Sequence, residues 1–64
     1  MNSRHIIEAA KAQWVGIQTS TDGPIVLFRD PVTTSCLALF ERGLTVAGVS
    51  ERLLATRKVF GVIS

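Results

Sequence analysis

The apolar residues near the N-terminus first follow a helical period and then a strand period. Ile6, Ala10 and Trp14 recur every four residues, which is typical of one face of a helix. After Trp14, β-branched residues alternate with small or polar ones, and this two-residue period is typical of a half-buried strand. The pattern therefore predicts a helix over residues 3–13 and a strand over residues 14–20, with Trp14 as a core plug or an interface anchor.

Two turn signals divide the next part of the chain. Asp22-Gly23 can supply the positive φ angles that a two-residue hairpin turn requires. Asp30-Pro31-Val32-Thr33 has Asp at the first corner and Pro at the second, as a type I turn prefers. We therefore expect strands over residues 25–29 and 34–40, with Gly43 ending the last one.

The remaining residues predict a second helix from about Thr45 to Phe60. Each helix is preceded by a side chain that can accept from the free N–H groups of its first turn: Asn2 or Ser3 for the first and Thr45 for the second. Gly61 is placed to end the second helix in a left-handed turn. Gly48 weakens the first turn by about 1 kcal/mol relative to Ala, so a start at Ser50 is the alternative.

The expected fold is α+β, in the order α-β-β-β-α. It comprises one small domain over residues 1–64, in which a three-stranded antiparallel meander packs both helices on one face. The register implied by the two turns gives one uncharged face of larger residues, which we assign to the core: Val15, Ile17, Val26, Phe28, Leu37 and Leu39.

The opposite face of the expected sheet is too apolar for a face in water. A solvated antiparallel face reads polar at alternate positions, and contiguous exposed apolar surface marks an interaction site. With Gly16 and Thr34 beside them, the residues predicted to form this partner face are Gln18, Ile25, Leu27, Arg29, Cys36, Ala38 and Phe40. A one-residue change in the second turn would move the third strand's residues to the other face.

Size and composition favour self-association. In a chain of 64 residues, apolar burial and the entropy cost of folding nearly cancel, so small domains usually rely on a disulfide, a metal or a partner. Cys36 is the only cysteine and His5 the only histidine, so neither a disulfide within the chain nor a zinc site is expected. We therefore expect a homo-oligomer, most simply a dimer.

The hydrophobic share is 47% and the mean hydropathy +0.35, yet no apolar run reaches the ~18 residues of a membrane span. The lone cysteine and the lack of a signal-peptide core predict a cytoplasmic protein.

No constellation of residues points to catalysis. A nucleophilic Cys36 would need a base, and nothing in the sequence ties it to His5, which is interpreted as a neutral surface histidine. The carboxylates outside the first helix are explained by turns or by a helix start: Asp22, Asp30, Glu41 and Glu51. The glycines match no phosphate-binding loop. No enzyme activity and no cofactor are expected.

The charge leaves one alternative open. Net charge is +2, and residues 31–64 carry the whole excess, through the cations Arg42, Arg52, Arg57 and Lys58. A solvated helix face is the plainer interpretation, but a few cations can also position a phosphate backbone.

The leading hypothesis is a small non-enzymatic interaction or regulatory protein that self-associates through its sheet and acts by protein–protein binding. The alternative is a small nucleic-acid-binding regulator that uses the basic second helix.

Overall fold

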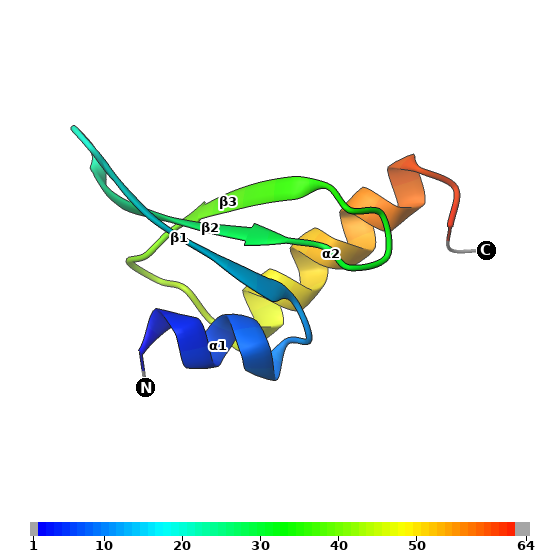
Figure 1. Ribbon diagram of the computed structural model, residues 1–64, viewed down its shortest axis with the longest axis horizontal. Coiled ribbons are helices and arrows are strands. Elements are labelled where there is room, and N and C mark those ends of the chain that lie inside the picture. Colours follow the sequence, from blue (N-terminus) through cyan, green and yellow to red (C-terminus); the bar gives the residue numbers. More distant parts are fainter. Residues whose placement is uncertain (1, 63–64) are drawn as a thin grey trace.

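The computed structural model describes residues 2–62 and has the expected α-β-β-β-α order (Figure 1). The elements are α1 (Ser3–Ala9), β1 (Gln13–Ser20), β2 (Gly23–Arg29), β3 (Cys36–Phe40) and α2 (Val46–Val59). The strands form one antiparallel sheet in the order β1-β2-β3. The prediction of a three-stranded meander flanked by two helices is confirmed.

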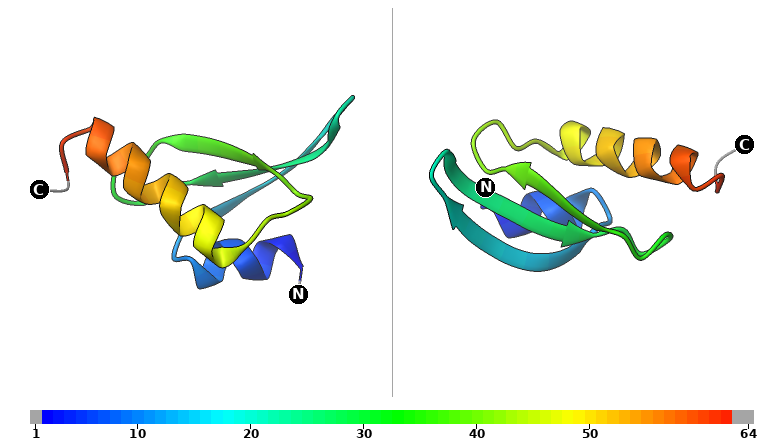
Figure 2. Two further views of the ribbon diagram at one scale, coloured as in Figure 1. Left: turned by 180° about the vertical axis from the view of Figure 1, so that it is seen from behind. Right: turned by 90° about the horizontal axis from the view of Figure 1, so that it is seen from above.

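Both helices lie on the same side of the sheet, and the core fills the space between the layers (Figure 2). β2, the central strand, sends Val26 and Phe28 into this space, and neither side chain has any exposed surface. Ile7 from α1 and Val49 and Leu53 from α2 pack into the same cluster. Since β2 is paired on both sides, its inward residues are the ones that both helices can reach.

The first helix is shorter than its apolar spacing predicts. Asn2 is the N-cap, and its side-chain oxygen accepts from the N–H of His5 at 2.9 Å. The helix ends at Ala9 rather than at residue 13, because Lys11 adopts the left-handed conformation with φ at 64°. The N–H groups of Lys11 and Ala12 donate back to the last helical carbonyls. This closure directs the chain towards β1, and the spacing of apolar residues does not reveal it.

The first hairpin turn lies one residue earlier than predicted. Ser20 pairs with Gly23, so the two loop residues are Thr21 and Asp22, and of the loop and its flanks only Gly23 has positive φ. Ile17 consequently pairs with Val26 and not with Phe28 as the sequence had indicated. Moving the turn centre by one residue moves each partner by two, and a shift of two leaves every side chain on the same face.

The second connection is longer than a type I turn. It comprises residues 30–35, so β3 begins at Cys36 instead of Thr34, which lies in the loop with φ at 61°. Val26 therefore pairs with Leu39 rather than with Leu37. This difference is again two residues, and the predicted facing of β3 is preserved.

A β-bulge in β1 overturns one core assignment. The register shifts between Trp14 and Gly16, so that Trp14 lies opposite Phe28 and Gly16 lies opposite Leu27. Trp14 packs against the core, whereas Val15, predicted to lie in it, is 45% exposed. Bulges change the direction of the residues around them, which is why strict alternation fails here.

The second helix starts at Val46, because the Thr45 hydroxyl accepts from the N–H of Gly48 at 3.0 Å. The alternative start at Ser50 is therefore wrong. The predicted left-handed residue after the helix is confirmed, with Gly61 at φ of 72°.

Two further apolar residues on the covered side of their elements are largely exposed. Ile17, assigned to the core from the sequence, is 51% exposed although it pairs with buried Val26. It lines a hollow with Ser3, Arg4 and Ile6, so α1 lies near it without covering it. Phe60 is 59% exposed because the end of α2 extends past the sheet (Figure 1). Facing the covered side is thus not enough for burial where the opposite layer does not cover the side chain.

Candidate interaction surface

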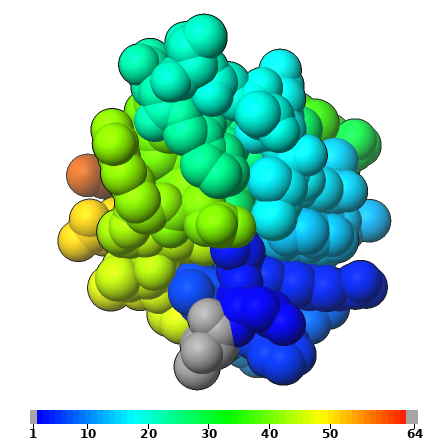
Figure 3. Space-filling view, turned by 90° about the vertical axis from the view of Figure 1, so that its left-hand side faces the viewer, coloured from blue at the N-terminus to red at the C-terminus, as the bar shows by residue number. Residues whose placement is uncertain are grey.

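The seven residues predicted to form a partner face share the face of the sheet that the helices do not cover, here called the open face (Figure 2). They lie in neighbouring rows across the strands: Gln18, Ile25 and Phe40 in one, Leu27 and Ala38 in the next, and Arg29 and Cys36 in the third. Thr34, placed beside them by the sequence, lies in the loop instead. The chain around residues 20–24 rises clear of α1 at the hairpin end (Figure 3).

The middle of the open face is apolar, and its largest side chain, that of Leu27, is flanked by two much smaller residues. Leu27 lies between Gly16 on β1 and Ala38 on β3, two residues with little or no side chain. A Cβ atom at Gly16 would meet nothing within 4 Å, so the space beside Leu27 is empty. Phe40 is 43% exposed at the edge of this apolar centre. Ala38 is exposed and Leu27 partly exposed, so water reaches apolar side chains in the middle of this face.

Two arginines border the apolar centre. Arg29 Nη2 donates to Cys36 Sγ at 3.7 Å. The guanidinium carbon of Arg42 lies 5.4 Å from the centre of the Phe40 ring, within cation–π distance. An apolar centre with a polar rim is the usual anatomy of a protein–protein interface.

The thiol of Cys36 is exposed, and the side chain that contacts it is a guanidinium rather than a base. His5 is exposed on α1, and its main-chain N–H donates to the side chain of Asn2. A nucleophilic thiol needs a base that takes its proton. The structure brings no such base to Cys36 within residues 2–62, which leaves this side chain as part of the open face.

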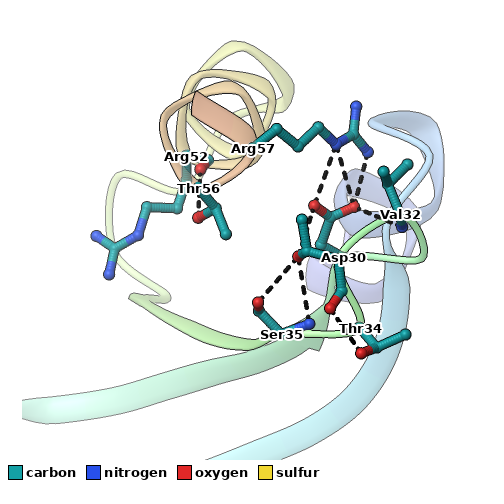
Figure 4. Close-up of polar contacts among 8 residues, drawn as sticks. Asp30, Val32, Thr34, Ser35, Arg52, Thr56 and Arg57 are labelled. Atoms are coloured by element: carbon teal, nitrogen blue, oxygen red, sulfur yellow. Dashed lines mark hydrogen bonds and ion pairs between the residues drawn. The ribbon is translucent and has the colours of Figure 1, made fainter. Parts of the chain in front are cut away.

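The loop between β2 and β3 is organised by one buried carboxylate (Figure 4). Asp30 has no exposed surface, and its oxygens accept from the N–H of Val32 at 3.0 Å and from the hydroxyl of Thr33 at 3.1 Å. Arg57 reaches it from α2, with Nη2 at 2.7 Å from Oδ1 and Nε at 3.1 Å from Oδ2. The hydrogen bonds from Arg57 lower the pKa of Asp30 to about 2, although burial of the carboxyl acts in the opposite direction.

This ion pair was not predicted. The sequence explains Asp30 as a turn residue, which is confirmed, but it treats Arg57 as a solvated or phosphate-contacting cation. The two residues are 27 positions apart, and no local pattern links them. Of the four cations proposed for nucleic-acid contact, Arg57 is held by Asp30 and Arg42 lies over Phe40, whereas Arg52 and Lys58 are exposed.

Other polar groups have simple roles in the fold. Glu41, which follows β3, accepts from the hydroxyl of Ser3 at 2.8 Å and so ties α1 to the sheet. Within residues 2–62, no three His, Cys, Asp or Glu side chains gather as metal ligands would. In the same part of the chain, no helix has the length and apolar character needed to cross a membrane.

Comparison with known proteins found no matching family model, no similar curated protein and no similar solved structure. Any assignment of function must therefore come from the surface itself.

Proposed function

We propose that this protein is a small, non-enzymatic interaction protein that self-associates through the open face of its sheet and acts by protein–protein binding. The observation that carries the proposal is the apolar centre around Leu27, which no helix covers. Removing such a surface from water contributes about 25 cal/mol for each Å² of apolar area. A chain this small has few other sources of stability.

The shape of the open face favours a second copy of the same chain as the occupant. The side chain of Leu27 is large, and that of Ala38, its partner on β3, is small. A two-fold axis in the plane of contact, running along the strands between β2 and β3, would place each Leu27 over the Ala38 of the other copy. The same axis would place Ile25 over Phe40, since these two residues also pair across the strands. An isologous contact requires this kind of self-complementarity, and two sheets packed face to face keep their strands nearly aligned.

The proposal is tested by Leu27→Glu, with Thr21→Glu as the matched control. Both variants add one negative charge, but Leu27 lies at the centre of the open face and Thr21 in the exposed hairpin turn outside it. We expect sedimentation equilibrium at micromolar concentration to show the same oligomer for wild type and Thr21→Glu and a smaller assembly for Leu27→Glu. Circular dichroism should show that Leu27→Glu keeps its secondary structure. A wild-type monomer, or a Leu27→Glu variant with unchanged mass, would contradict the proposal.

A further inference from the structure

The outward side of α2 carries a short pattern that is symmetric in spacing when read from either end. Glu51, Leu54, Ala55 and Lys58 follow one another at spacings of three, one and three residues. At 3.6 residues per turn they fall within an arc of about 100° on the helix surface. Buried Val49 and Leu53 lie on the opposite side of the helix. We call these four residues the outward stripe.

The outward stripe is open to solvent. Leu54 is 51% exposed, and the other three residues are exposed as well. Together they line a hollow of about 330 Å³ on the surface of α2. Seen from behind, no other element lies over this helix (Figure 2). In the part of the chain that the structure describes, neither Glu51 nor Lys58 forms an ion pair.

We infer that the outward stripe is a second self-association surface, on which the α2 helices of two copies pack antiparallel around a two-fold axis. With the axis midway between Leu54 and Ala55, each Glu51 lies opposite the Lys58 of the other copy. The axis keeps each side chain on its own side of the stripe, so the two Leu54 side chains meet along one edge and the two Ala55 side chains along the other. Charge complementarity and the apolar contact between the two Leu54 side chains are what select a second copy as the occupant.

A simpler explanation of the two charges exists, and it makes a different prediction. Glu51 lies nearer the positive end of the α2 dipole and Lys58 nearer the negative end, so each could stabilise its own helix. That effect acts within one chain. The proposed contact acts between chains, so only the contact makes the effect of one substitution depend on the residue carried by the other molecule.

The outward stripe shares no residue with the open face, although Glu51 and Ala55 line a hollow that also reaches Phe40 at the edge of that face. The inference therefore does not depend on the proposed function. Two different two-fold contacts in one chain would produce a closed tetramer or an open array rather than a dimer.

The test exchanges the charges between copies. Glu51→Lys gives a stripe with two cations, and Lys58→Glu gives a stripe with two anions. Each variant should repel itself, whereas a mixture of the two restores opposite-charge pairs between the copies. In a Leu27→Glu background, which removes association through the open face, we expect the mixed pair to associate roughly tenfold more tightly than either variant with itself, measured by fluorescence energy transfer between labelled chains. The double variant Glu51→Lys/Lys58→Glu should associate like the wild-type stripe.

The matched control is Arg52→Glu, which changes the net charge as Lys58→Glu does but lies about 110° from the middle of the stripe around the helix. Mixed with Glu51→Lys, it should show no such preference. Equal association of all mixtures would overturn the inference, as would a preference that Arg52→Glu reproduces. These results are separate from the mass of Leu27→Glu, so failure of the stripe and failure of the open face are distinguishable.

A cross-link checks the helix direction. In a Cys36→Ser background, Ala55→Cys should form a disulfide between copies on oxidation, because the two positions lie within roughly 2 Å of each other along an antiparallel helix pair. Glu51→Cys should not, since its two copies are roughly 10 Å apart along the axis. Cross-linking at position 51 but not at position 55 would overturn the antiparallel arrangement.

Discussion

Adjacent residues of β2 have the same chemical character and opposite environments. Val26 and Phe28 are completely buried, whereas Ile25 and Leu27, which alternate with them, are only partly buried. Hydrophobicity therefore does not distinguish the two faces of this sheet. The helices distinguish them, because α1 and α2 return to the same side and cover only that side (Figure 2). An apolar face left uncovered by its own chain is available to another chain.

The covered side is also fixed by polar contacts that the open side lacks. The Arg57–Asp30 pair ties α2 to the loop beyond β2, and the Ser3–Glu41 hydrogen bond ties α1 to the end of β3. On the open face the corresponding polar contact is the one between Arg29 and Cys36, which is exposed. Exposed contacts contribute little to stability, so the difference between the faces extends from packing to electrostatics.

The largest expected effect comes from placing a charge on the covered face. Phe28→Glu would bury an unpaired carboxylate beside Val26 and Leu37, at a cost of several kcal/mol against a total stability of about 5 kcal/mol. Circular dichroism should show an unfolded chain, in contrast to Leu27→Glu one position away. If the isolated monomer is too unstable to stand alone, an osmolyte should restore Leu27→Glu before Phe28→Glu. A folded Phe28→Glu monomer beside an unfolded Leu27→Glu would mean that the two faces are exchanged.

A smaller effect is expected from the buried ion pair. Asp30→Asn should lower the free energy of unfolding by on the order of 2 kcal/mol, or roughly 10 °C in Tm, because Asn retains the shape of Asp but not its charge. Thermal denaturation followed by circular dichroism measures this. The control is Asp22→Asn in the exposed hairpin turn, which makes the same chemical change and should leave Tm nearly unchanged.

The same pair predicts a dependence on pH. The folded state lowers the pKa of Asp30 from 3.8 to about 2, so the carboxylate stabilises the fold at pH values above 3.8. That contribution is lost as the pH falls from 3.8 towards 2. Over this range Tm should fall more steeply for wild type than for Asp30→Asn. Parallel curves for the two proteins would show that Asp30 does not titrate with folding.

The smallest expected signal is nucleic-acid binding. With Arg57 held by Asp30, fewer free cations remain on and before α2 than the sequence suggests. We expect weak or no binding to duplex DNA or RNA at physiological salt, and affinity at low salt that falls steeply as salt is added. Fluorescence anisotropy with a labelled duplex measures both. Sub-micromolar binding that resists salt would favour the regulator hypothesis over self-association.

Local sequence signals were sufficient to predict the elements and the two faces of the sheet. Thr45 as an N-cap and Gly61 as a C-terminal stop depend on neighbours a few residues away, so a sequence shows them directly. The open face was found although both turns were placed wrongly, because both errors shifted the strand partners by two residues. A two-residue shift is invisible to a pattern whose period is two.

Tertiary structure decided what local patterns do not encode. The pairing of Asp30 with Arg57 joins residues 27 positions apart, and the bulge that exposes Val15 is defined by how β1 pairs with β2. The sequence by itself determined which residues are apolar and in what order the elements follow. Only the folded chain determined which apolar residues its two helices could cover, because coverage depends on the position of an element in space rather than on its own residues.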